Sequence, residues 1–486
     1  MKMKGNIISL ALHGLILCST IITFGVLSLN DDSLKEVQSK FTGELERNVT
    51  IRILENDTAK ESGYLSELLD AFNEAYKEYG IVAKDANMDQ YIDLETGGPY
   101  GYGPDVLYQA NDAIMKYVAG RHILPLPIED LECYEQTSIN AFNAYKYKVG
   151  DQTYYFGVPV NIQQPLLFYR KDLLPNDWKE HYDKDNDDIP DMVEYWSELY
   201  SYSKKIREDS SGLKYGYMKS LNDGYFASGY FFSYGGYVFG GEDGNDIYDI
   251  GFSKNDSYLG GKIIRDLASI MNLECTEDTI TRNSYSRMAQ GTYFATMTTP
   301  DVYSLFVKEL ANQYTKNGLS ENDALIKAKE NIVVKDVPLL PESGDLNDKE
   351  GPTKKMKVMG GVNGYAISSY TKSPNASLEF VKFATSYSLI KKRAQMLSIS
   401  PAREDVSKEE GGLNNMIYEN LNNGNIYVMP SVRELAQVWT PLQTFCAQLA
   451  DDVLNAKGKY ETDEAIKKGL ENVDQQIYDA IHTLNN

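Results

Sequence analysis

The sequence predicts an α/β protein built of two lobes. Its 486 residues, 42% of them hydrophobic, can bury a large core and exceed the length of one small domain. Helical and strand patterns alternate along the chain, as they do in α/β domains. The chain has no internal repeat and no long low-complexity linker, so we expect short crossovers to join the lobes.

The first clear helix and the first strands follow from apolar spacing. A helix is predicted over residues 63–80, with Gly80 placed to end it and with apolar residues at i, i+3 and i+4 spacings: Leu65, Leu68, Leu69, Phe72 and Tyr76. Short apolar runs bounded by turn residues predict strands; these runs are IVA (81–83), DVLY (105–108), YFGVPV (155–160) and LLFY (166–169).

Two later helices are also predicted. In SPNASLEFVKFATSY (373–387), Ser373 is a candidate N-cap and Pro374 occupies the first helical position, where a missing N–H costs nothing. The last helix is predicted from a single apolar stripe, formed by Ile466, Leu470, Val473, Ile477 and Ile481.

Residues 1–30 are expected to be an export signal or a membrane anchor. Lys2 and Lys4 precede an almost charge-free stretch over residues 7–29, which as a helix of ~35 Å would cross a ~30 Å hydrocarbon core. The lysines on one side and acidic residues on the other direct the body outward. LILC, ending at Cys18, resembles a bacterial lipoprotein box, although Leu17 departs from it. Cleavage, lipidation and retention therefore stay open.

Composition excludes several functions. A net charge of −22 argues against a nucleic-acid partner, which needs a basic face. The body has three cysteines, Cys133, Cys275 and Cys446, so at most one intramolecular disulfide is possible. No histidine shares a metal-ligand spacing with another ligand, and no nucleotide-binding glycine motif follows a strand. We therefore expect no catalytic cofactor.

Six separated segments, in order, resemble landmarks of the maltose-binding-protein family, the family 1 extracellular solute-binding proteins of ABC importers. The segments are GYGPDVLYQANDAIMKYVAGRHILPL, YYFGVPVNIQQPLLFYRKDLLP, LNDGYFASGYFFSYGGYVFGG, SRMAQGTYFATMTTPDVYSLF, GGVNGYAIS with SPNASLEFVKFAT, and MPSVRELAQVW. The resemblance covers nearly the whole body of the chain.

The resemblance implies a two-lobed, type II periplasmic-binding-protein-like fold, each lobe a sheet flanked by helices. The first lobe would comprise residues 45–161 plus 362–404, and the second 162–361 plus 405–486. The lobes would close on a carbohydrate in the cleft between them, and the protein would deliver it to a membrane permease as a monomeric receptor without enzymatic activity. It would work at the extracellular face of the bacterial membrane.

The family's binding residues carry over to several positions. A sugar presents hydroxyls to carboxylates and amides, and C–H faces to aromatic rings. The resemblance implies such roles for Asp57 near a turn after the first strand, Asp112, Asp223, Tyr225 and the stacking Trp439.

Four positions depart from the maltose-binding pattern. Gln109, Ala113, Gln163 and Asp301 stand where that pattern has a tryptophan, an arginine, a glutamate and a second tryptophan. Each lost contact is worth ~1–3 kcal/mol, so the sequence favours a glycan other than maltose. Gln109, Gln163 and Asp301 are still expected at the site. Tyr303, together with Tyr108 and Tyr293, is a candidate source of replacement rings.

An acidic run, HYDKDNDDIPDMVEYW at residues 181–196, reads as an insertion on the second lobe. Counted from Asp183, oxygen donors occupy positions 1, 3, 5, 7, 9 and 12 of an EF-hand-like loop: Asp183, Asp185, Asp187, the Ile189 carbonyl, Asp191 and Glu194. Position 6, usually glycine, is Asp188. The spacing predicts a structural Ca²⁺ site; a solvated acidic loop is the alternative.

Two alternative functions stay open at this point. An extracellular glycosidase could pair two carboxylates among Asp112, Asp223 and Asp301, although no acid/base signature is present. A receptor that feeds a sensor kinase would have the same binding lobes.

Overall fold

The computed structural model describes residues 31–241, 243–277 and 279–485. The export segment predicted over residues 1–30 lies outside them. Within the described residues, no helix combines the length and apolar character needed to cross a membrane. The chain groups into two compact units, which confirms the predicted two-lobed α/β organisation.

The units interleave along the chain. The first contains residues up to Glu135, Tyr145–Val158 and Gly364–Ser386; the second contains Gln136–Ala144, Pro159–Asn363 and Tyr387–Asn486. This grouping differs from the expected lobe bounds mainly at residues 387–404. There helix α17 (Tyr387–Leu397) packs on α18 (Glu404–Glu410) and on β16 (Ser400–Pro401), and so belongs to the second unit.

The first unit is centred on parallel strands. β1 (Thr50–Leu54) pairs with β2 (Val82–Asp85) on one side and with β3 (Val106–Ala110) on the other. These strands belong to a sheet of order β16-β6-β15-β3-β1-β2, with β17 (Ile426–Val428) also paired to β15. β6 (Val158–Gln163) and β15 (Val358–Ile367) are the strands in which the chain passes from one unit to the other.

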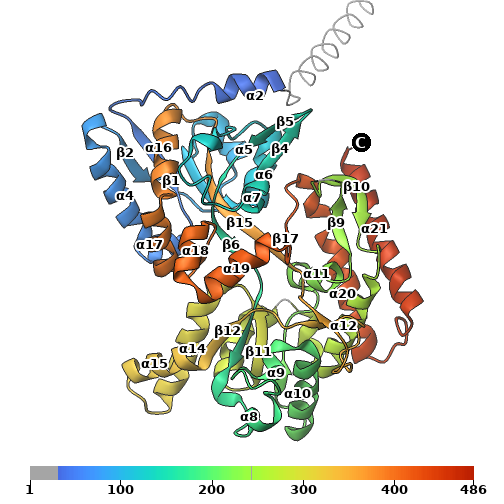
Figure 1. The fold of residues 1–486 in the computed structure, drawn as a ribbon. Coiled ribbons are helices and arrows are strands. Elements are labelled where there is room, and N and C mark those ends of the chain that lie inside the picture. The colour runs from blue at the N-terminus through green and yellow to red at the C-terminus, as the bar shows by residue number, and fades with distance from the viewer. Residues whose placement is uncertain (1–30, 242, 278, 486) are drawn as a thin grey trace, which may run out of the picture. The chain divides into compact units, whose positions relative to one another are not determined.

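The helices of the first unit follow their apolar spacing (Figure 1). The predicted helix over 63–80 is α4 (Tyr64–Ala75), which buries Leu65, Leu68 and Phe72, followed by a short 3₁₀ turn that ends at Gly80. The other helices are α2 (Asp31–Gln38), α3 (Asp57–Glu61), α5 (Leu94–Gly97), α6 (Asn111–Ala119) and α16 (Pro374–Ala384), and a hairpin is formed by β4 (Lys146–Val149) and β5 (Gln152–Tyr155).

Helix α16 begins where the sequence predicts, but its cap is a different residue. Ser373 occupies the N-cap position without a capping side-chain hydrogen bond. Instead, Glu46 accepts from the backbone N–H groups of Asn375 (3.2 Å) and Ala376 (2.7 Å). A carboxylate at a helix N-terminus satisfies otherwise unpaired donors and favours the helix dipole. The cap therefore comes from a segment more than 300 residues earlier.

The second unit contains a four-stranded sheet of order β12-β7-β11-β8. β7 (Leu166–Arg170) pairs antiparallel with β12 (Ile332–Lys335) and with β11 (Tyr293–Thr298), and β11 pairs parallel with β8 (Tyr215–Tyr217). The unit also contains the helices α7 (Ile139–Asn143), α8 (Trp178–His181), α9 (Asp191–Glu194), α10 (Trp196–Asp209), α11 (Gly224–Phe232), α13 (Thr279–Ala289), α14 (Tyr303–Lys316), α15 (Glu321–Asn331) and α19 (Gly412–Asn422).

A separate layer of the same unit contains the C-terminal helices. α12 (Tyr258–Ile270), α20 (Trp439–Leu454) and α21 (Asp463–Asn485) pack on one another beside the hairpin of β9 (Tyr237–Gly240) and β10 (Asp246–Gly251) (Figure 1). The predicted stripe of α21 is buried, from Ile466 to Ile481. A short ladder of β13 (Leu340–Pro341) and β14 (Thr353–Lys354) completes the unit. Cys275 and Cys446 are buried free thiols, and Cys133 is buried as well.

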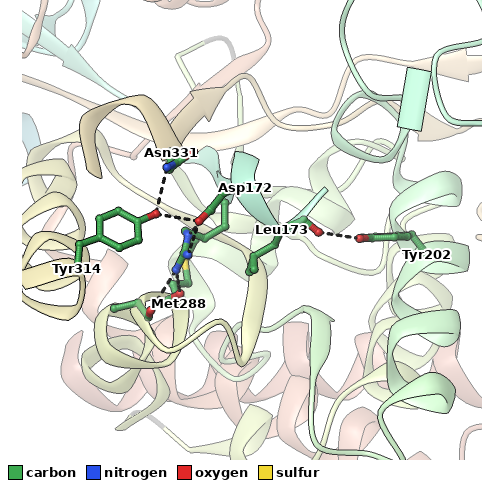
Figure 2. Close-up of polar contacts among 8 residues, drawn as sticks. Asp172, Leu173, Tyr202, Met288, Tyr314 and Asn331 are labelled. Atoms are coloured by element: carbon green, nitrogen blue, oxygen red, sulfur yellow. Dashed lines mark hydrogen bonds and ion pairs between the residues drawn. The ribbon is translucent and has the colours of Figure 1, made fainter. Parts of the chain in front are cut away.

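An ion pair between a buried arginine and a partly exposed aspartate stabilises one end of β7 (Figure 2). The guanidinium of Arg170 donates to both carboxylate oxygens of Asp172, at 2.8 and 2.9 Å, and to the carbonyls of Met288 and Ala289. Tyr314 donates to Asp172 at 2.8 Å. Burial raises the pKa of Asp172, but the hydrogen bonds and charge of Arg170 outweigh burial and hold this pKa below its ordinary value.

Candidate ligand-binding residues in each unit

In the first unit, the candidate residues gather where parallel strands end. Asp57 follows β1, Gln109 is near the end of β3, and Asp112 lies in the first turn of α6 just beyond it. The carboxyl ends of neighbouring parallel strands lie at the same edge of a sheet, which is where open α/β sheets bind ligands. The topology therefore brings together residues that are more than 50 positions apart.

Hydrogen bonds join two of these residues through a third, Gln90. The side chain of Gln90 accepts from the backbone N–H of Asp57 and donates to its carboxylate, both at 3.3 Å. The amide of Gln109 donates to the carbonyl of Gln90 at 2.7 Å. Among the described residues, no donor reaches the buried Oε1 of Gln109. Sequence reasoning missed Gln90, because nothing in its neighbourhood marks it.

Asp112 is a half-buried carboxylate. Burial raises its pKa, while hydrogen bonds from the backbone amides of Ala113 and Asp112 itself lower it. Beneath this edge, Glu55 is fully buried and accepts a hydrogen bond from Tyr365. This edge of the sheet thus carries carboxylate and amide groups next to the buried hydrogen bond between Tyr365 and Glu55.

In the second unit, three chain segments end at one edge of the sheet. β8 and β11 are parallel, so residues 218–223 and 299–303 leave the sheet at the same edge. β7 begins at that edge, because Leu166 pairs with Thr298, and Gln163 lies just before it. Thr296 donates to the carbonyl of Met218 at 2.7 Å and ties the first two segments together. The candidate residues Gln163, Asp223, Tyr225, Asp301 and Tyr303 lie in or next to these three segments.

Asp223, Tyr225 and Trp439 come together through one glycine. Asp223 caps helix α11 by accepting from the backbone N–H of Tyr225 at 3.2 Å. Gly224, between them, packs so closely on the Trp439 ring that a Cβ there would lie 3.2 Å from Cε3. Both aromatic rings are partly exposed. Two partly exposed rings beside a capping carboxylate can offer stacking faces and an acceptor to a sugar.

Lys219 is an unexpected neighbour of this group. Its side chain is only 3% exposed, and its ammonium lies 3.3 Å from the centre of the Phe226 ring. Burial lowers the pKa of Lys219 to about 8, and the charge of Asp223 partly offsets this effect. Nothing in the sequence predicts the burial of Lys219, because a lysine is ordinarily a surface residue.

The other predicted residues of this unit are placed differently. Asp301 is exposed in the 3₁₀ turn Pro300–Val302. Tyr303 is half-buried near Phe168, and burial raises its pKa. Gln163 precedes the buried Gln164, which donates to Asp336 at 3.0 Å and accepts from Asn420 at 3.2 Å. Tyr293, like Tyr108 of the first unit, is more than nine-tenths buried, so both offer little ring surface as replacement stacking planes.

The acidic loop folds as a compact turn. Oxygen atoms of Asp183, Asp185 and Asp187 lie within 4.8 Å of one another, as do those of Asp185, Asp191 and Glu194. Asp187 donates its backbone N–H to Asp183 at 3.1 Å, and Ile189 donates its own to Asp187 at 2.8 Å. Burial, then repulsion from Asp187 and Asp185, raises the pKa of Glu194 to about 7.

Residues 56–388 match the family of bacterial extracellular solute-binding proteins, and the chain belongs to that family. The galactooligosaccharide-binding protein of Bacillus subtilis (strain 168) is 24% identical over 439 residues, which cover 87% of this chain and 88% of the relative. The maltodextrin-binding protein MdxE of the same organism is 20% identical over 409 residues, with 82% and 85% covered.

Solved structures confirm the predicted type II two-lobed fold. The maltose-binding periplasmic protein MalE from Listeria monocytogenes, in complex with maltose, matches with a TM-score of 0.67 at 20% identity, covering 89% of this chain and 98% of the other. An extracellular solute-binding protein from Staphylococcus aureus, also in complex with maltose, matches with a TM-score of 0.65 at 18% identity, with 90% and 99% covered.

Proposed function

We propose that this protein is the extracellular receptor of an ABC importer, and that it captures an oligosaccharide for a membrane permease. Membership of the solute-binding family supports the receptor role. Both relatives named above are oligosaccharide-binding proteins, and each is covered over more than four-fifths of its length. Membership of the solute-binding family also supports a permease partner.

The observation that carries the proposal is the buried, unpaired Oε1 of Gln109 in its chain of hydrogen bonds with Gln90 and Asp57. A buried acceptor without a donor costs about 1–3 kcal/mol, and a sugar hydroxyl would supply that donor. In the second unit, Tyr225 and Trp439 would stack on the C–H face of a sugar ring. We infer that each of these two groups of residues contributes to sugar binding.

Galacto-oligosaccharides are the first ligand class to test, and maltodextrins are the second. Gln109, Gln163 and Asp301 replace groups on which the maltose-binding pattern depends, and they offer amide and carboxylate hydrogen bonds in place of stacking rings. Such a site selects by hydroxyl orientation, because each misplaced hydroxyl leaves a buried polar group without a partner.

The test is isothermal titration of the purified protein with galacto-oligosaccharides, maltodextrins and their monosaccharides. We expect one saturable site, a Kd for the Trp439→Ala variant raised about 10–100-fold, and a Kd for Gln109→Ala raised about tenfold. Trp178→Ala is the matched control, because Trp178 follows the opposite end of β7, and it should bind as the wild type does. Equal affinity in all three variants would refute the assigned residues.

We also propose that the protein does not hydrolyse the sugar that it binds. Prolonged incubation should release no new reducing ends, and Asp223→Asn should weaken binding without changing any turnover. Hydrolysis by the wild type that Asp223→Asn abolishes would instead establish the glycosidase alternative.

Residues 1–30 are proposed to export the protein and to tether it outside the membrane. The charge-free stretch and the flanking lysines support this proposal. Membrane fractionation of producing cells, with a Cys18→Ala variant beside the wild type, separates the routes. Release of the variant alone indicates lipidation, retention of both proteins indicates an uncleaved anchor, and release of both indicates a cleaved signal.

The protein is also proposed to be a monomer. Light scattering of the purified protein should report the mass of one chain.

A further inference from the structure

The carboxylates of the acidic loop, which have the sequence spacing of EF-hand ligands, also lie close together in the folded loop. Asp185 belongs to both oxygen clusters, so the cluster with Asp183 and Asp187 adjoins the cluster with Asp191 and Glu194 at this residue. Ligand oxygens at 2.3–2.6 Å from a Ca²⁺ ion lie up to about 5 Å apart across it, which fits separations within 4.8 Å.

A second observation points to a ligand at this centre. Asp191 is 3% exposed, and its Oδ2 is buried without a hydrogen bond from any described residue. The Oε2 atom of Glu194 is buried in the same way. Water would hydrate these carboxylate oxygens in a solvated surface loop, whereas the burial of a charged oxygen without a donor is unfavourable unless a cation compensates.

Lysines near the loop pair with other groups. Lys184 bonds to Glu198 at 2.7 Å, and Lys179 pairs with Asp188, whose side chain lies outside the cluster. Within the described part of the chain, no lysine, arginine or histidine forms an ion pair with the five clustered carboxylates. The charges of Lys184 and Lys335 offset part of the repulsion at Asp191 and Glu194, but neither lysine pairs directly with a clustered carboxylate.

The backbone has the conformation that an EF-hand-like loop needs. Position 6 requires a left-handed residue, and Asp188 adopts φ +66° there. The departure from glycine at this position thus leaves the loop geometry intact, because aspartate tolerates the left-handed region better than most residues. The Ile189 carbonyl follows directly at position 7, where the loop supplies a main-chain ligand.

The last ligand of the loop is connected to a distant segment of the same unit. The carbonyl of Glu194 accepts from the backbone N–H of Leu339 at 2.7 Å, and Trp196 donates its N–H to the carbonyl of Leu339 at 3.0 Å. Glu198, one turn into α10, bonds to Lys184 of the loop and to Lys349 at 2.8 Å. Fixing Glu194 therefore fixes the segment around Leu339.

We propose that residues 183–194 bind one Ca²⁺ ion through Asp183, Asp185, Asp187, the Ile189 carbonyl, Asp191 and Glu194. The bound ion clamps the start of helix α10 to the segment around Leu339. The site is independent of the sugar-binding residues, so its test needs no sugar.

The experiment titrates the EDTA-stripped, dialysed protein with CaCl₂ and with MgCl₂ by calorimetry. We expect one Ca²⁺ per chain, with Mg²⁺ bound much more weakly because it does not favour a cage of this ligand number. Glu194→Gln should weaken Ca²⁺ binding about a hundredfold or more. Asp185→Asn should also weaken it, and because Asp185 is exposed its replacement does not endanger folding. The matched control Asp188→Asn should bind as the wild type does.

Two further readouts separate an ion site from a merely structural loop. In EDTA, the Asp185→Asn variant should melt at or above the melting temperature of the wild type, because the substitution removes charge repulsion. Added Ca²⁺ should raise the melting temperature of the wild type but not that of the variant. Hydrogen exchange at the amides of Leu339 and Trp196 should slow with Ca²⁺ in the wild type alone. Absence of binding at millimolar Ca²⁺, or binding that Asp185→Asn leaves intact, overturns the site. Unchanged exchange at Leu339 overturns the clamp.

Discussion

At the scale of single residues, Gly224 determines how close Trp439 lies to Asp223 and Tyr225. A Cβ at this position would lie 3.2 Å from the Trp439 ring, closer than most carbon contacts. We expect Gly224→Ala to displace the ring by a few tenths of an ångström and to raise the Kd for sugar several-fold with little loss of stability. Titration calorimetry and the melting temperature check both expectations. Unchanged affinity would mean that the position of the Trp439 ring does not matter for binding.

Lys219 gives the folded protein a distinct response to alkaline pH. Its pKa of about 8 lies below that of a lysine in the unfolded chain, about 10.4, so between these values the unfolded state binds more protons. Stability from this group therefore rises with pH, by about 1 kcal/mol per unit between pH 8 and 10. The difference in unfolding free energy between wild type and Lys219→Met, from urea titrations across this range, should show that slope. A pH-independent difference would indicate an ordinary pKa.

At the scale of elements, the end of β7 depends on the pair of Arg170 and Asp172 (Figure 2). Asp172→Asn leaves a guanidinium that is 5% exposed without its counter-charge, so we expect a loss of about 3 kcal/mol. Tyr314→Phe, the control, removes one hydrogen bond to Asp172 and should cost about 1 kcal/mol.

At acid pH, the pair of Arg170 and Asp172 should no longer contribute to the free energy of unfolding. The pKa of Asp172 lies below its ordinary value, so its stabilisation is complete above about pH 4 and is lost as the pH falls through the lowered pKa. Urea unfolding of wild type and Asp172→Asn at pH 7, 4 and 3 measures this effect. A gap that stays constant to pH 3 would contradict the role of the ion pair.

Helix α16 offers a second prediction at this scale. Glu46 caps it through two backbone N–H groups and the side-chain amide of Asn375. Glu46→Gln should lower the unfolding free energy by about 1 kcal/mol, because the amide is a weaker acceptor and carries no charge for the helix dipole. Glu44→Gln, two residues away and exposed, should have no effect in the same denaturant titration.

At the scale of the whole molecule, each unit has its own core, so unfolding in two steps is expected. Sugar that binds a folded unit stabilises that unit by mass action, by ~2.7 kcal/mol at a hundredfold excess over Kd, and so raises the melting temperature of the step in which it unfolds. Differential scanning calorimetry with and without sugar tests this expectation. If only one step shifts, the sugar binds to one unit alone.

Local patterns in the sequence predict much of this structure and less of its candidate site. The stripe of α21, the helix over 63–80 and the donor order of the acidic loop depend on near neighbours, and the structure has all three. Gln90, Glu46 and Lys219 went unnoticed, because their roles depend on partners that are distant in sequence. The order of family landmarks identified Asp223, Tyr225 and Trp439, whereas their contact through Gly224 is visible only in three dimensions.

The sequence by itself determined the α/β class, the family and the spacing of the acidic loop, because these are encoded in apolar periodicity, ordered segments and fixed intervals between carboxylates. Only the tertiary structure decided which side chains share a sheet edge, which carboxylate oxygens are buried without donors and how far burial moves the pKa of Lys219. Those properties depend on strand order and on exclusion of water, and neither is a function of distance along the chain.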